Sequence, residues 1–277
     1  MMRNTLLAAT SFLGTVQAAT IGVNFTHDGT NPAAPDDVLF PSTASAGAPG
    51  FAQTNWNHVV TDWSGSGGND ALFTAGLSDS TGATTSDLIM VSYPTGHSDQ
   101  VHFDSNNTWS SASGNATAND TLMNGYLDDG GNDQPYANIS LAGGVTSATI
   151  VLYIHGDGAN GPVGRYWLEE WSDPLVAGTV ITDQVGISSN DYTGTYVSAG
   201  TFSQTGTPSN VNVPSGNYIV FENITASNIR IRSAGNGDPE DFGRGPLNAF
   251  QVITVPEPSS LGLLALAGLS FLRRRRA

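Results

Sequence analysis

The chain of 277 residues contains no cysteine and no lysine. Without cysteine, no disulfide can stabilise the fold, so a folded body must rely on core packing or on bound ions. The common catalytic motifs are missing too: there is no Gly-x-Ser-x-Gly elbow, no His-Glu-x-x-His, no phosphate-binding loop and no dinucleotide fingerprint. These absences exclude thiol catalysis and favour a protein that is not an enzyme.

Positive charge is scarce as well. All nine basic residues are arginine, and five of them lie in the terminal segments, at Arg3 and at positions 273–276. The remaining body, residues 19–256, holds four arginines against 23 acids, a formal charge of −19. Such a body repels nucleic-acid phosphates and anionic membrane surfaces. Nucleic acid is therefore not an expected partner, whereas cations and uncharged polymers such as extracellular polysaccharides are.

The N-terminus has the order of a secretory signal peptide. Arg3 is the only charge before Asp28, residues 6–18 are mostly apolar or small, and Val16-Gln17-Ala18 fits the small-x-small pattern of a signal peptidase site. We expect signal peptidase to remove a signal helix, residues 1–18, by cutting after Ala18 or, alternatively, after Ala19. The other interpretation is a buried first strand or helix, which the polar sequence that follows disfavours.

The C-terminus combines a Pro-Glu-Pro triplet, a short apolar run at residues 261–272 and an arginine cluster. A helix over the run would be about 18 Å long at roughly 1.5 Å per residue. The hydrocarbon core of a bilayer is about 30 Å thick, so this transmembrane helix is short. The arginines should stay on the cytoplasmic side of the inner membrane. The segment 255–277 is thus expected to hold the body at the membrane transiently.

These three parts, in this order, resemble the tail of PEP-CTERM exported proteins. The resemblance implies an exosortase that cuts near the triplet and passes the body to the cell surface or to the extracellular matrix of a biofilm, in a Gram-negative-type bacterium. An ordinary tail anchor is the alternative. The residues that carry the resemblance are Pro256, Glu257, Pro258, Arg273, Arg274, Arg275 and Arg276.

Between the two ends, residues 19–254 are predicted to form one all-β domain. Short apolar runs rich in β-branched and aromatic residues alternate with clusters of Gly, Pro, Ser, Asn and Asp. Ile150, Leu152 and Ile154 recur with period two, and Ile229 and Ile231 alternate with two arginines. We therefore expect an antiparallel two-sheet β-sandwich or jelly roll. The runs are residues 20–25, 58–61, 88–93, 137–141, 148–155, 164–171, 176–182, 194–202, 217–224, 228–233 and 249–254.

One short helix is predicted near residues 119–127, with Asn119 or Asp120 as its N-cap. At coarse grain the body resembles the galactose-binding-like jelly rolls of exported proteins. The likeness is carried by Ile21-Gly22-Val23-Asn24-Phe25, by residues 122–128, by Tyr153-Ile154-His155-Gly156-Asp157 and by residues 248–253. It implies a glycan-binding or calcium-stabilised module and supplies no ligand residues.

Two acidic clusters are candidate calcium sites. Asp128, Asp129 and Asp133 lie on a glycine-rich stretch, and closely spaced oxygen ligands suit a hard cation such as Ca²⁺. The second cluster has three acids in four residues, which repel one another unless a cation or Arg244 lies nearby. It contains Asp238, Glu240 and Asp241. The alternative for both clusters is a solvated turn.

Candidate sugar-binding residues come from the aromatics and from one strand end. Trp56 and Trp63 lie among Asn, Ser and Gly, and are expected to be exposed for stacking on a sugar ring. His155 ends the strongest predicted strand and Asp157 follows it, where binding loops begin. For each of these the ordinary alternative is a side chain packed in the core or a polar side chain exposed to water.

Glu169 and Glu170 are two neighbouring carboxylates of the kind that glycoside hydrolysis uses. Adjacent residues of a strand point to opposite faces, so these two cannot flank one glycosidic bond. The sequence therefore predicts an exported, non-catalytic β-sandwich that binds glycan or acts as a calcium-stabilised adhesive or structural module. The alternative is a secreted carbohydrate-active enzyme, a glycoside hydrolase or lyase, that uses acids brought together in a cleft.

Overall fold

The computed structural model describes residues 18–27, 39–61, 76–85, 88–91, 100–103, 117–128, 136–142, 145–155, 164–173, 176–235 and 245–256. Within these ranges the chain forms strands, turns and one short helix. The elements are β1 (Thr20–His27), β2 (Asn57–Thr61), β3 (Leu88–Val91), β4 (Gln100–Phe103), α1 (Ala118–Leu122), β5 (Gly125–Asp128), β6 (Tyr136–Leu141), β7 (Val145–Tyr153), β8 (Gly164–Glu170), β9 (Thr179–Val180), β10 (Gln184–Ile187), β11 (Ser198–Ser203), β12 (Asn210–Val213), β13 (Tyr218–Ile224), β14 (Asn228–Gly235) and β15 (Ala249–Pro256).

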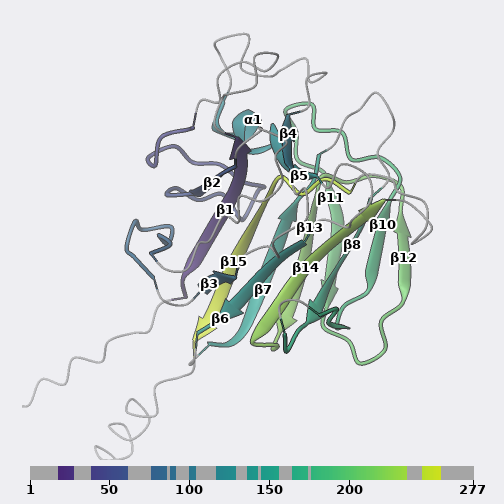
Figure 1. Ribbon diagram of the computed structural model, residues 1–277. Coiled ribbons are helices and arrows are strands. Elements are labelled where there is room, and N and C mark those ends of the chain that lie inside the picture. Colours follow the sequence, from purple (N-terminus) through teal and green to yellow (C-terminus); the bar gives the residue numbers. More distant parts are fainter. Residues whose placement is uncertain are drawn as a thin grey trace, which may run out of the picture.

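Two mixed sheets pack face to face, as Figure 1 shows. The first has the order β11-β13-β7-β15-β1-β2, and the second has the order β12-β10-β8-β14-β6-β3, with β9 paired to β8. β4 and β5 form a separate small hairpin-like pair. The all-β sandwich predicted from the sequence is confirmed. Pairing departs from purely antiparallel in β1/β2, β10/β12 and β11/β13, each of which is a parallel pair at the edge of a sheet.

The main core lies between the two sheets and follows the period-two pattern of the sequence. This core contains the fully buried Ile150 and Leu152 of β7 and Ile154, the residue after β7. They lie opposite Ile229 and Ile231 of β14. Removal of such apolar side chains from water is the main favourable term of folding, at about 25 cal/mol per Å². Since no disulfide is present, this packing carries the stability of the sandwich.

A second apolar cluster covers the outer face of the first sheet. Val151 and Tyr153 of β7 alternate with the core residues and point to this face, where they are also buried. Phe40, Ala46 and Ala48, from the long segment before β2, pack over them together with residues of α1. The first sheet is therefore buried on both faces, which explains the continuous apolar run in the sequence of β7.

The helix differs from its prediction. α1 ends at Leu122, and the neighbouring Gly125 already begins β5, so the predicted helix over residues 119–127 is wrong beyond its first turn. Its N-cap is Thr117 and not Asn119 or Asp120. Asp120 instead closes a capping box, because its carboxylate accepts the backbone N–H of Thr117 at 2.8 Å.

Candidate functional site

The sandwich has two distinct ends. At one end, which we call the anchor end, β1 starts and β15 stops: Thr20 pairs with Ile253, and Pro256 pairs with Val145. At the other end, the loop end, β1 and β7 stop and β13 and β15 start, so that Ala249 pairs with both Asn24 and Tyr153. Figure 1 shows β1, β15 and β7 side by side across this length.

Chain segments that contain most of the predicted site residues begin at the loop end. β7 stops there, and Asp157 follows shortly after His155 in the sequence. β14 stops at Gly235, opposite Gly164 at the start of β8, and residues 238–241 come next. β2 runs parallel to β1 and stops at Thr61, just before Trp63. Strand ends of a sandwich are where ligand-binding loops are usually mounted.

Buried asparagines tie the elements of the loop end together. The Asn248 amide, fully buried at the start of β15, donates hydrogen bonds of 3.0 Å to the carbonyl oxygens of Met123 and Gly125. Its Oδ1 accepts the backbone N–H of His155. One side chain thus links β15, the turn between α1 and β5, and the end of β7.

Asn217 does the same on the other side of this end. Its Oδ1 accepts the Val197 N–H at 2.8 Å, and its Nδ2 donates to the carbonyl oxygens of Asp191 and Thr195. Satisfied buried amides of this kind fix loop geometry because an alternative conformation would leave polar groups buried without hydrogen bonds. The loop end is therefore a rigid platform.

His155 belongs to this platform and is not an exposed ligand. Its side chain is buried, and Nδ1 accepts the backbone N–H of Tyr192 at 2.9 Å. Nδ1 as acceptor places the ring proton on Nε2. The structure thus gives His155 a positioning role for residues 190–192, and the ring stands with its edge toward the Tyr192 ring.

Some buried amide atoms at the loop end lack a hydrogen-bond partner among the described residues. They are Oδ1 of Asn24 and Oδ1 of Asn124, whereas the Asn190 side chain lies beside the Tyr166 hydroxyl. Asn190 is 1% exposed and neighbours His155 through its backbone oxygen, 3.4 Å from Nδ1. Buried polar atoms are normally satisfied, so each of the two orphaned oxygens is a position where an ordered water would be stabilised.

Trp56 is not exposed, contrary to the prediction. Its side chain is 5% exposed, its indole N–H donates to the Ala46 carbonyl, and its ring packs against Gly22. A Cβ at Gly22 would lie only 2.6 Å from the Trp56 ring, so glycine is needed at that position of β1. Trp56 therefore holds the segment before β2 against the first sheet and offers no ring face to a sugar.

A buried amide and phenol network lies beside Trp56. Gln251 of β15 donates to the carbonyl of Phe51 at 2.8 Å and to Oε1 of Gln53 at 2.9 Å. The Tyr153 hydroxyl donates to Oε1 of Gln251 and accepts the N–H of Ala48. Burial raises the pKa of Tyr153 well above its ordinary value, so its hydroxyl keeps its proton.

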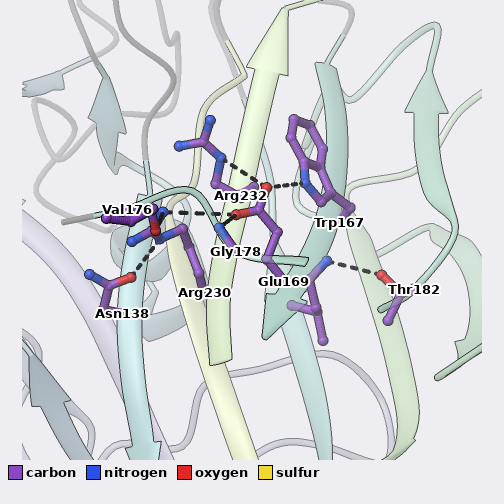
Figure 2. Close-up of polar contacts among 9 residues, drawn as sticks. Asn138, Trp167, Glu169, Val176, Gly178, Thr182, Arg230 and Arg232 are labelled. Carbon is purple, nitrogen blue, oxygen red and sulfur yellow. Dashed lines mark hydrogen bonds and ion pairs between the residues drawn. The ribbon is translucent and has the colours of Figure 1, made fainter. Parts of the chain in front are cut away.

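The largest cluster of charged side chains among the described residues lies on the outer face of the second sheet (Figure 2). Glu169, 5% exposed, accepts the indole N–H of Trp167 at 2.9 Å and the Gly178 N–H at 3.2 Å. Arg230 and Arg232 lie 3.9 and 3.6 Å from its carboxylate oxygens. Glu170 is exposed and pairs with Ile229, whose side chain points to the core, so the two acids point to opposite sides as predicted.

The same cluster fastens the segment around β9 to the sheet. Arg230 donates to the Val176 carbonyl at 3.0 Å and to Oδ1 of Asn138 at 2.8 Å. The Thr182 hydroxyl accepts the Leu168 N–H at 2.9 Å (Figure 2). A carboxylate engaged by two N–H donors and two guanidinium groups has no free face for general acid or base work, so the cluster is structural.

The acidic candidates are only partly described. Asp128 is the last residue of β5, paired with Gln100. The residues Asp129, Asp133, Trp63, Asp157, Asp238, Glu240 and Asp241 lie outside the described residues. Among the part of the chain that the structure describes, no three His, Asp or Glu side chains gather as metal ligands would. The calcium and sugar-binding predictions therefore stay predictions.

The processing sites fall partly within the structure. Ala18 is exposed, and Ala19 contacts Thr254 of β15. Pro256 ends β15, so this strand continues beyond the domain limit of 254 expected from the sequence. The residues Glu257, Pro258, Arg273, Arg274, Arg275 and Arg276 lie outside the described residues, as does the expected anchor helix. Within the described ranges no helix is long and apolar enough to span a bilayer.

The functional residues that sequence analysis missed are the buried amides. Gln251 stands between Phe250 and Val252 in an otherwise apolar strand, and a polar residue at such a position signals a buried hydrogen-bond network. Asn248 and Asn217 stand immediately before strands, where Asn resembles an ordinary turn residue. Nothing in their local sequence distinguishes them.

Comparison with known proteins identifies the tail. Residues 254–276 match the family model of the PEP-CTERM protein-sorting motif. No curated protein and no solved structure matches the chain. The chain therefore carries an exosortase sorting signal: it is an exported protein that passes through a membrane-anchored intermediate and is processed by an exosortase on its way to the cell surface or the extracellular space.

Proposed function

We propose that the exported body is a non-catalytic recognition module whose loop end binds extracellular polysaccharide, with calcium stabilising its acidic segments. The observation that carries the proposal is that the two ends of the sandwich differ in which strands stop there. β15, which leads into the sorting motif, stops at the anchor end, whereas the strands that precede most candidate residues stop at the loop end. A body held by its tail thus presents the loop end outward.

Two further observations support the proposal. The platform beneath the loop end is rigid, because Asn248 and Asn217 satisfy the backbone of several elements at once. The orphaned oxygen atoms of Asn24 and Asn124 are amide oxygens, which are ligands that Ca²⁺ accepts. An uncharged polysaccharide suits the body, since its formal charge of −19 would repel anionic polymers.

The test is thermal unfolding of the processed, exported protein in EDTA, in added CaCl₂ and with a panel of neutral polysaccharides. A ligand that binds only the folded state raises the melting temperature by mass action. We expect an increase with Ca²⁺ and a further increase with one polysaccharide. The double variant Asp128→Asn with Asp129→Asn should lose the calcium response, whereas Glu222→Gln, an exposed acid of β13, should retain it.

Three outcomes distinguish the alternatives. No response to any polysaccharide leaves a structural matrix component. No response to calcium removes the metal from the proposal. Release of reducing sugar or unsaturated products from a polysaccharide would show the secreted carbohydrate-active enzyme and overturn the non-catalytic assignment.

A further inference from the structure

The sorting signal and the folded sandwich share three residues. The matched motif begins at residue 254, and β15 continues to Pro256, the first proline of the triplet. In β15 these residues are paired with β7: Thr254 with Ala148, Val255 with Ser147 and Pro256 with Val145. The start of the signal is therefore part of an interior strand of the first sheet.

Specific hydrogen bonds hold this strand end. The Thr254 N–H donates to the Ala19 carbonyl at 2.9 Å, and the Thr254 hydroxyl accepts the Ala19 N–H at 3.2 Å. The Thr146 hydroxyl donates to the Val255 carbonyl at 2.9 Å. Thr254 is fully buried. An enzyme that reads an extended peptide needs backbone groups that here are engaged by β7 and by the residue before β1.

The segment that connects β15 to the apolar run of the tail is short. Only residues 257–260 separate β15 from the apolar run that starts at Leu261. Four extended residues span at most about 14 Å, at roughly 3.3–3.6 Å each. The anchor end must therefore stay close to the membrane surface, and the motif cannot move far from the sheet while β15 remains paired.

The end of β15 is nevertheless suited to opening locally. Val255 is 48% exposed, and the pairing register shifts between Val255 and Pro256. Phe250 and Val252, the core residues of β15, lie further along the strand and need not move. Strand ends with few buried apolar contacts open at a small fraction of the free energy of global unfolding.

We propose that the folded sandwich gates its own sorting: the exosortase acts on the motif only after residues 254–256 leave β7 and the Ala19 contact. Processing speed is then proportional to the fraction of molecules in which the end of β15 is open. Opening leaves the main core intact, so sorting requires no unfolding of the body.

The experiment follows tail removal by pulse-chase in cells that express the full chain with its exosortase. Eight Gly and Ser residues inserted between Ile253 and Thr254 free the whole motif from the sheet and should raise the processing rate about fivefold or more. Ser147→Cys combined with Val255→Cys introduces the only disulfide, since the chain has no cysteine, and should lower the rate at least fivefold until reductant is added.

Milder variants test the same gate without insertion. Thr146→Ala removes the hydrogen bond to Val255 and should raise the rate about fivefold, since one hydrogen bond changes an opening equilibrium by about this factor. Thr225→Ala removes a threonine whose contacts are to Gln204 and not to β15, and should leave the rate unchanged. Measurement of the melting temperature of each variant is the control that its body stays folded.

The results decide the proposal in either direction. A faster insertion variant and a reductant-sensitive slow cysteine pair support gating. An insertion variant that is processed at the natural rate or more slowly overturns it, as does a cysteine pair that is processed as fast as Val255→Cys alone while its disulfide is shown to have formed.

Discussion

Glu169 is the buried charge on which the outer face of the second sheet depends. Its carboxylate receives two N–H donors and lies within 4 Å of two guanidinium nitrogens. Glu169→Ala would remove the counter-charge of Arg230 and Arg232 at once. Loss of one partner of a buried ion pair costs about 3–5 kcal/mol. We therefore expect urea denaturation to show a decrease of this size in the free energy of unfolding.

The adjacent residue provides the control for that measurement. Glu170 is exposed and belongs to the same strand, so Glu170→Ala changes net charge and composition identically. Surface substitutions usually change stability by no more than about 0.5 kcal/mol. If the two variants differed by less than 1 kcal/mol, the cluster would not stabilise the fold in the way the geometry indicates.

His58 is the residue for which the structure predicts a pH dependence. Burial lowers the pKa of its imidazole, which packs edge-on against Phe40 and contacts the Asn24 amide through Nδ1. Because the unfolded chain binds the proton more readily, stability is complete above the unfolded pKa of about 6.5 and decreases as pH falls below it.

The measurement is the free energy of unfolding at pH 7.5 and at pH 5.5, for the natural protein and for His58→Gln. Glutamine keeps a hydrogen-bonding group near Asn24 but has no proton to gain. We expect a smaller decrease between the two pH values in the variant. Equal decreases in the two proteins would assign the pH response to other groups.

At the scale of elements, the apolar pattern was a reliable guide to the central strands. Alternation around Ile229 predicted β14, whose Arg230 and Arg232 do point away from the core, and the run around Ile150 predicted β7, although β7 is buried on both faces. β10 and β12 were missed, because the four residues of each, QVGI and NVNV, are short and surrounded by turn residues. The predicted strand over residues 176–182 is reduced to Thr179–Val180, since the preceding residues cover the Glu169 cluster instead.

The segment before β2 shows what local sequence could not supply. Its Gly, Ser, Ala and Pro content indicates a loop, and it is one, yet Ala46, Gly47 and Ala48 are buried. Their burial depends on Gln251 and Tyr153, which are distant in sequence. Trp56 was expected to be exposed for the same reason: polar neighbours in sequence do not reveal the sheet that covers its ring.

Gln251→Ala tests this attachment. The substitution leaves the Phe51 carbonyl and the Tyr153 hydroxyl without their buried partner, which costs about 2 kcal/mol. The substitution should increase the rate of hydrogen exchange more in residues 46–56 than in β7 or β14. Gln204→Ala removes polar contacts to Thr225 at the anchor end and should leave exchange in residues 46–56 unchanged. Uniformly faster exchange in the Gln251 variant would mean that the segment is not a separate unit.

For the whole molecule, the assignment of strand ends to the anchor end or the loop end could not be predicted from the sequence. The tail motif was legible because it is local: a triplet, an apolar run and an arginine cluster in order. Which strand ends share an end of the sandwich depends on the pairing of β1 with β15 and of β15 with β7. The paired residues of β1 and β15 are up to 233 residues apart in the sequence, as Thr20 and Ile253 are.

The net negative charge of the body leads to a last prediction, which distinguishes binding of calcium at a site from screening of charge by salt. The 23 acids of the body outnumber its four arginines and repel one another. Any salt should therefore raise the melting temperature of the body by screening this repulsion. Screening depends on ionic strength alone, whereas a site depends on the ion. We therefore expect CaCl₂ to raise the melting temperature more than NaCl or MgCl₂ at matched ionic strength, because Ca²⁺ accepts the flexible oxygen sets that Mg²⁺ rejects. If the three salts gave the same increase, the acidic segments would act only as a solvated surface, and the loop end would have to recognise its ligand without a metal.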